Sequence, residues 1–176
     1  VQGQRYNSEI GTYASVQRNA TDTLARVTRE LNQSTSIHSQ TNTGNGVLFL
    51  SFGPTVDGEP PLLLDPTNGK IMWRKWVAIL HDIENQKLLR VEVPLSSSTS
   101  QLTTAPAPAV ALDSIQALPD ASRRPLAEAI SAFQIQPIGR GFKISLTSTG
   151  TVPVAALTAA QRKLNVSVTS TIAVQN

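Results

Sequence analysis

The chain has 176 residues, no cysteine, 15% charged residues and a formal net charge of +3. This length fits one domain that can bury an adequate core, and the lack of cysteine excludes disulfide and thiol chemistry. The sequence contains no apolar run close to the roughly 20 residues that a membrane-spanning helix needs. Lys and Arg are scattered and mostly not interleaved with aromatic residues, so the pattern leaves nucleic-acid binding open but does not support it.

Residues 1–33 are predicted to form one long α-helix. Apolar side chains recur there at steps of three and four residues, which places them on a single stripe of a 3.6-residue helix. The stripe consists of Tyr6, Ile10, Tyr13, Val16, Ala20, Leu24, Val27 and Leu31. We predict that it is the assembly face of the helix and that it packs on a sheet, so that Leu24→Asp should unfold the domain. Because the helical pattern is already established at Val1, we also expect the helix to continue upstream of it.

The rest of the chain is predicted to be rich in antiparallel strands. Residues 47–52 form an apolar strand, and residues 71–81 and 87–94 form a hairpin in which strict alternation would place Trp73 and Trp76 on opposite faces. A tight turn at residues 139–141 joins two further strands, and β-branched residues from 166 to 174 form the last one. The predicted fold class is therefore α+β. A long N-terminal helix packs on an antiparallel sheet, and a second small sheet or hairpin group lies on the C-terminal side.

The connecting segments and the core complete this prediction of one domain over residues 1–176. Residues 96–111 read as a flexible loop rich in Ser, Thr, Ala and Pro. Pro125 is expected to open a helical turn over 125–130, and residues 147–152 are expected to turn the chain. The predicted core consists of Leu24, Val27, Leu31, Phe49, Val77, Ile79, Leu89, Phe133, Ile144 and Ile172.

A search for chemistry in the sequence yields no catalytic, cofactor-binding or metal-binding residue. His38 and His81 stand in no metal-ligand spacing, and the chain has no GxSxG, P-loop or GxGxxG pattern. Oxygen ligands for calcium are supplied around one loop, but their spacing does not match the helix–loop–helix calcium motif. These ligands are Asp57, Glu59, Asp65 and Asn68.

Three stretches in order, residues 24–33, 76–90 and 164–176, resemble the minor subunits of type IV pili and type II secretion systems. The first is similar to the family's helix end, with apolar residues followed by an acid and an amide. The second is similar to its strand, turn and Leu-x-Arg return, and the third to its last strand, although Gln175 stands where the family usually has arginine. The chain is most similar to the W-type minor pilins and the J-type minor pseudopilins.

The resemblance implies a non-catalytic filament subunit of the bacterial cell envelope. An apolar helix segment upstream of residue 1 would anchor it in the inner membrane, with the head in the periplasm or outside the cell, and would later pack in the filament core. Its partners would be other pilin or pseudopilin subunits, with no small-molecule substrate and no cofactor. The resemblance leaves open which filament system the subunit serves.

Three alternatives to a structural or initiating subunit remain open at this point. One is a free-standing β-rich module of the cell envelope that recognises sugar or protein. A second is a minor pilin used in DNA uptake, which would need its basic residues to converge on one face and would bind with strong salt dependence. The third is a hydrolase in which a histidine meets a nucleophile and an acid.

Overall fold

The computed structural model describes residues 2–32, 40–42, 46–54, 58–99, 122–139, 141–155 and 158–173. The helix α1 spans Gln2–Asn32, as the apolar period predicts. The strands within the described ranges are β1 (Gln40–Asn42), β2 (Gly46–Ser51), β3 (Trp73–Asp82), β4 (Lys87–Thr99), β5 (Ser122–Ala127), β6 (Ile130–Ile138), β7 (Gly141–Ala155) and β8 (Thr158–Ala173).

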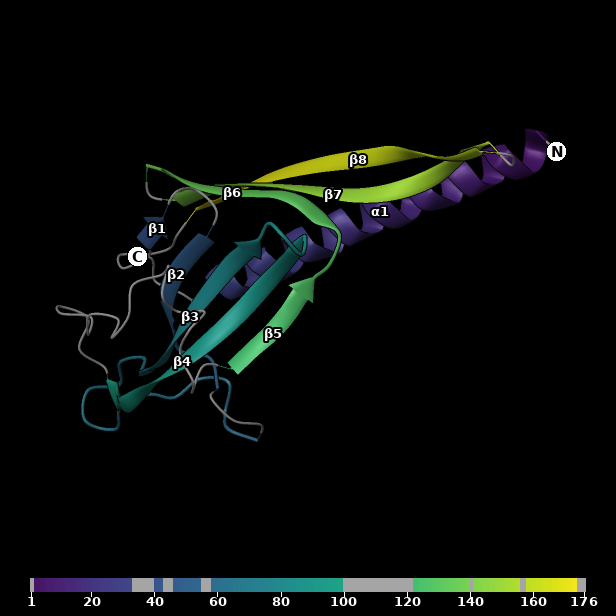
Figure 1. Ribbon diagram of the computed structural model, residues 1–176. Coiled ribbons are helices and arrows are strands. Elements are labelled where there is room, and N and C mark those ends of the chain that lie inside the picture. Colours follow the sequence, from purple (N-terminus) through teal and green to yellow (C-terminus); the bar gives the residue numbers. More distant parts are fainter. Residues whose placement is uncertain are drawn as a thin grey trace.

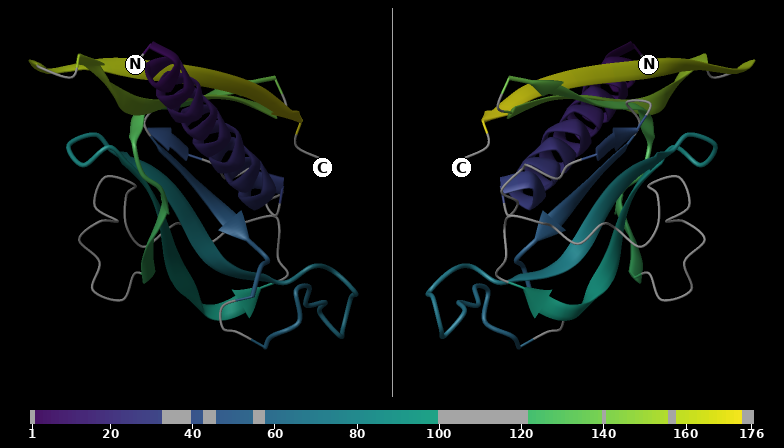
Figure 2. Two further views of the ribbon diagram at one scale, coloured as in Figure 1. Left: turned by 90° about the vertical axis from the view of Figure 1, so that its right-hand side faces the viewer. Right: turned by 90° about the vertical axis from the view of Figure 1, so that its left-hand side faces the viewer.

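The described strands form two antiparallel sheets, which confirms the predicted α+β class. One sheet has the order β1-β2-β3-β4-β5 and the other the order β6-β7-β8. The two sheets meet around the C-terminal half of α1, whereas the far end of the β7–β8 hairpin and the N-terminal half of α1 project together beyond the five-stranded sheet (Figures 1 and 2). The molecule therefore has a body with two sheets and an arm made of one helix and one hairpin.

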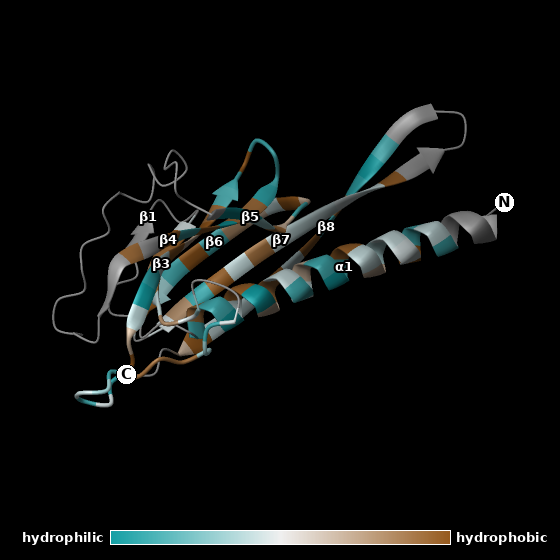
Figure 3. Cartoon of the chain, turned by 90° about the horizontal axis from the view of Figure 1, so that it is seen from below, coloured by the Kyte–Doolittle hydropathy of each residue, from teal (hydrophilic) through white to brown (hydrophobic). Residues whose placement is uncertain are grey.

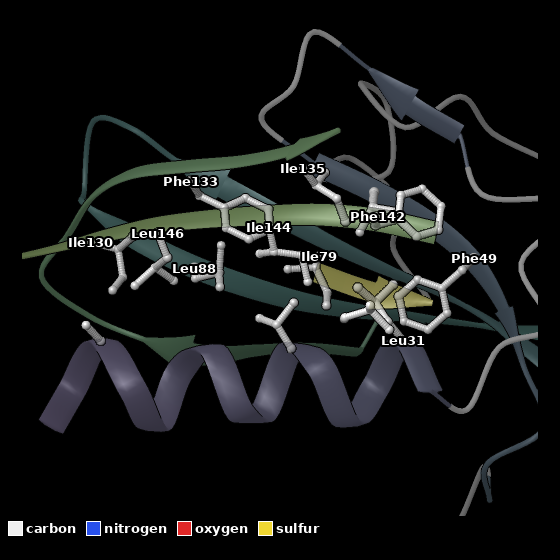
Figure 4. Close-up of a cluster of buried hydrophobic side chains, with 14 of the residues drawn as sticks. Leu31, Phe49, Ile79, Leu88, Ile130, Phe133, Ile135, Phe142, Ile144 and Leu146 are labelled. Carbon is white, nitrogen blue, oxygen red and sulfur yellow. The ribbon is translucent and has the colours of Figure 1, made fainter. Parts of the chain in front are cut away.

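One hydrophobic core joins α1 to both sheets. Phe49 and Ile79 reach it from the five-stranded sheet, Phe133 and Ile144 from the three-stranded sheet, and Leu31 from the helix (Figure 4). Two of the predicted core residues differ from the prediction. Leu24 is only partly buried at the margin of the core, and Leu88 is fully buried in place of Leu89, which is half-buried.

The prediction of a helical turn over residues 125–130 is wrong, because the chain crosses there from one sheet to the other. β5 ends at Ala127, residues 128 and 129 form the link, and β6 begins at Ile130. Pro125 lies in β5, the outermost described strand of its sheet, where a residue without an N–H is tolerated. Ala129 has a positive φ of 57°, and its carbonyl accepts a 2.9 Å hydrogen bond from Thr149 N.

The predicted placement of the two tryptophans on opposite faces is also wrong. The pairing of β3 with β4 shifts register between Trp73 and Lys75, and such an irregularity interrupts the alternation of faces. Trp73 and Trp76 therefore lie in one buried cluster, separate from the core beneath α1, and Phe52 packs against Trp73 with 6.1 Å between ring centroids. Neither tryptophan belongs to the core cluster that contains the buried residues of α1.

A strand occupies the beginning of one predicted loop and the whole of a predicted turn. β4 continues to Thr99, so the expected 96–111 loop does not begin at residue 96; its residues from 100 on lie outside the described ranges. The turn expected over 147–152 is the interior of β7, which pairs with β8 from Gly141 to Ala155. The two strands have 15 and 16 residues, and they are long enough to accompany α1 along the arm.

Candidate assembly interface

From Val16 on, the predicted helix stripe is buried against the sheets, except that Leu24 is only partly buried. The buried residues recur at three- and four-residue steps and include Thr23, which was not part of the predicted stripe. The buried residues are Val16, Ala20, Thr23, Val27 and Leu31. This part of α1 therefore packs in the core that both sheets share.

The N-terminal part of the stripe is open to solvent. Ile10 and Tyr13 are each 50% exposed, and the side chain of Tyr6 lies outside the described residues. In this stretch α1 lies alongside the β7–β8 hairpin and extends beyond the five-stranded sheet (Figures 1 and 3). The predicted assembly face thus divides into an inner part that packs on the domain and an outer part that presents large apolar side chains.

The arm is closely packed where Gly150 of β7 meets α1. A Cβ built on Gly150 would lie 2.5 Å from Val16 Cγ2 and 3.3 Å from Thr12 Cγ2. Nearer the N-terminus of α1, an ion pair between Arg162 of β8 and Glu9 of α1 also joins the hairpin to the helix. Glycine at position 150 therefore allows the helix to approach the hairpin.

We predict that Gly150→Val separates the helix from the hairpin in the arm. Forcing a side chain into a filled site costs about 1–3 kcal/mol, and Val16 is β-branched and stiff. Hydrogen exchange of the amides of residues 7–15 should accelerate, while the buried strand β3 keeps its protection. A Val16→Ala replacement in the same chain should restore slow exchange, because it removes the methyl group that clashes. Unchanged exchange in Gly150→Val would show that the arm is not packed in this way.

One flank of α1 holds the crossover between the sheets. Asn19 Nδ2 donates hydrogen bonds to Glu128 O at 2.9 Å and to Ser148 Oγ at 2.8 Å. About two turns further along the helix, Arg26 Nη1 donates to Leu126 O at 3.1 Å. These contacts satisfy backbone carbonyls at the point where neither sheet can pair them.

A chain of charges ties the C-terminal end of α1 to the middle of the five-stranded sheet. Arg90 Nη2 donates to Glu30 Oε2 at 3.0 Å, Arg90 Nη1 also contacts Glu92, and Lys75 Nζ lies 2.7 Å from Glu92 Oε1. Burial raises the pKa of Glu92, but hydrogen bonds from Lys75 and Arg90 outweigh it and hold that pKa below 4.5. Burial likewise acts to lower the pKa of Arg90, and its two carboxylate partners reverse the effect.

An open groove runs along the other flank of α1, between the helix and β8. Its lining includes Thr21, Leu24, Ala25, Thr28 and Arg29 of the helix and Ser170 of β8. The lining is mainly apolar, because the leucine, the alanine and the threonine methyl groups supply most of it. The sequence pattern did not identify this groove, since Leu24 was expected to be fully buried.

The two histidines and the oxygen ligands of the 57–68 loop do not assemble into a catalytic or metal site within the described ranges. His81 Nε2 lies 2.9 Å from Ile130 O, while His38 and Asp57 lie outside those ranges. Glu59 pairs with Arg74 at 3.1 Å, and the side chains of Asp65 and Asn68 organise their own turn. No cluster of three or more acidic, histidine or cysteine side chains suited to a metal occurs among the described residues.

None of the helical segments that the structure describes is both long and apolar enough to cross a lipid bilayer. Comparison with known protein families, with curated proteins and with solved structures finds no match to this chain.

Proposed function

We propose that this chain is the head of a non-catalytic filament subunit of the bacterial cell envelope, of the minor pilin or minor pseudopilin kind. In this proposal α1 continues upstream as an apolar helix, which anchors the subunit in the inner membrane and then packs among neighbouring subunits. The head remains on the surface of a type IV pilus or a type II secretion pseudopilus. The long helix seated on antiparallel sheets is consistent with this proposal, although that architecture is not specific to such subunits.

The observation that carries the proposal is the solvent-exposed outer part of the apolar stripe on α1. Ile10 and Tyr13 belong to the same stripe as the buried Val16 and Ala20, yet each is half-exposed. Large apolar side chains on one helical face that the domain itself does not cover are typical of a contact with another protein. A helix whose apolar stripe is buried in one part and exposed in another suits a subunit that joins its neighbours through that helix.

The proposal predicts that a photo-crosslinking amino acid at Tyr13 captures a neighbouring filament subunit in the native host. Position 18 provides the control, because Arg18 is exposed and lies about 140° around the helix from Tyr13. Mass spectrometry of the crosslinked product should identify a pilin-family helix at position 13 and much less product at position 18. Equal capture at both positions, or capture of unrelated proteins only, would contradict the proposal.

The codons upstream of residue 1 give an independent test. The proposal requires a short basic leader followed by about 20 apolar residues that continue α1. An upstream sequence that encodes a polar domain would defeat the filament assignment.

A further inference from the structure

β8 is the outermost strand of the three-stranded sheet among the strands that the structure describes (Figures 1 and 2). A Cβ on Gly141 would meet the carbonyl oxygen of Ile172, so Ile172 turns its carbonyl toward β7. Backbone groups of successive residues point to opposite sides of an antiparallel strand. The odd-numbered residues Ser167, Thr169 and Thr171 therefore direct their N–H and C=O groups away from β7, toward the outer edge of the sheet.

Within the part of the chain that the structure describes, this edge lacks the usual protection against pairing. Proteins commonly guard an edge strand with charged residues, proline or a bulge. Residues 164–173 of β8 contain no charged residue and no proline, and they pair with β7 without a register shift. Charges occur only further back, at Arg162 and Lys163. This stretch of edge is ten residues long, and every second residue in it directs its N–H and C=O groups outward, where another strand could pair with them.

The groove beside α1 would receive the side chains of such a strand. Val166 and Ile172 of β8 are buried and its alternate residues are exposed, so even-numbered side chains face the helix. In a strand added to β8, every second side chain would likewise point to the helix side. There it would meet the groove that Leu24 and Ala25 line together with Ser170. Backbone pairing and apolar burial would then occur at one place, which is how strand addition gains both affinity and specificity.

We propose that the outer edge of β8 and the adjoining groove form a docking site for an extended segment of another protein. The segment would carry small aliphatic side chains at alternate positions, because the groove is open to solvent and mainly apolar. It would carry acidic residues near its ends, since Arg29 lies at one end of the groove and Lys163 precedes the uncharged run of β8. This inference does not depend on the filament function, and either can fail without the other.

A strand appended to the chain tests the site at high effective concentration. The probe is a flexible Gly/Ser linker after residue 176, followed by ten residues of alternating valine and threonine with a glutamate at each end. A short linker gives an effective concentration in the millimolar range. We expect the amides of Ser167, Thr169 and Thr171 to exchange about 100-fold more slowly than in the unextended protein. Unchanged exchange of these outward amides would overturn the proposal.

Two host substitutions separate docking on the edge from a general effect on the fold. Thr169→Pro removes an outward N–H without removing a bond to β7, and it should abolish the protection at the neighbouring amides. Thr169→Ala keeps the N–H and should retain the protection. If the proline variant does not fold, Leu24→Asp provides a second test, because it places a charge in the groove and should reduce the protection at least 10-fold. Protection that survives Leu24→Asp would exclude the groove and overturn the proposed site.

Sedimentation of the unextended protein distinguishes the proposed occupant from a second copy of this chain. We expect a monomer over the concentration range of the exchange experiment. A concentration-dependent dimer that Thr169→Pro abolishes, and Thr169→Ala does not, would assign the edge to self-association and contradict the proposed occupant.

Discussion

Val27→Asp is expected to prevent the protein from reaching its native state. Val27 is fully buried in the core that joins α1 to both sheets. An aspartate there either buries an unpaired charge or takes up a proton in apolar surroundings, and we expect a loss of about 4 kcal/mol or more. Domains of this size are stable by about 5–15 kcal/mol, so a loss at the upper end of this expectation, where the charge stays unpaired, exceeds the stability of a domain near the lower end. The variant should then lose its near-ultraviolet circular dichroism and its cooperative urea transition.

Leu24→Asp is the matched control, three residues earlier on the same helix. Leu24 is only partly buried and lines the open groove, so its replacement leaves the new carboxylate in contact with water. This variant should fold cooperatively and lose about 1 kcal/mol, in contrast to the unfolding that the sequence pattern alone predicts. Equal loss in the two variants would show that α1 does not pack on the sheets with the Val27 face inward.

The difference between these two positions shows what the apolar period of the helix determines. The period identifies the helix and the direction of its stripe, because both follow from local spacing. The period cannot distinguish a residue at the centre of the stripe from one at its margin. It also cannot distinguish a part of the helix that the sheets cover from a part that they leave exposed. Leu24, Ile10 and Tyr13 all fit the stripe, but their exposure depends on where strands far away in sequence end.

The β-sheet predictions succeeded where the signal is local and failed where it depends on how the strands pair. The hairpin of β3 and β4 follows from alternation and a polar turn, both of which are local. The shared face of Trp73 and Trp76 follows from a register shift against Thr99 and Pro94, which becomes visible only once the strands are paired. Pro125 opens helices and is also tolerated in edge strands, so the crossover that follows it depends on the position of β5 in the sheet.

The charged network was beyond the reach of the sequence pattern because its members come from three elements. Glu30 lies near the end of α1, Lys75 is on β3, and Arg90 and Glu92 are two residues apart on β4. The two β4 residues share one face of their strand, and this local contact could have been anticipated from alternation. Their pairing with the other two residues requires the packing of α1 on the five-stranded sheet, which no local spacing contains.

Glu92→Gln is expected to destabilise the protein strongly at neutral pH. The carboxylate lies between Lys75 and Arg90, whose side chains are 5% and 15% exposed. Glutamine keeps the size of the side chain but removes the negative charge that Lys75 and Arg90 share. The two positive charges then lie near each other without that partner. Removing one member of a buried ion pair costs about 3–5 kcal/mol, and the partial exposure of this site reduces our expectation to about 2–3 kcal/mol. Urea unfolding of the two proteins at pH 7 measures the difference.

The pH dependence of that difference identifies its electrostatic origin. The pKa of Glu92 is lowered in the folded state, so its charge stabilises the protein above the ordinary value of 4.5 and loses this effect as the pH falls through the folded pKa. The gap between wild type and Glu92→Gln should therefore be full at pH 7 and should close in acid, where the wild-type carboxyl is protonated. Glu128→Gln is the control, because the Glu128–Lys87 pair is exposed and should contribute less than about 1 kcal/mol at any pH. A gap at position 92 that stays constant from pH 7 into acid would mean that the shape of the glutamate, and not its charge, accounts for the effect.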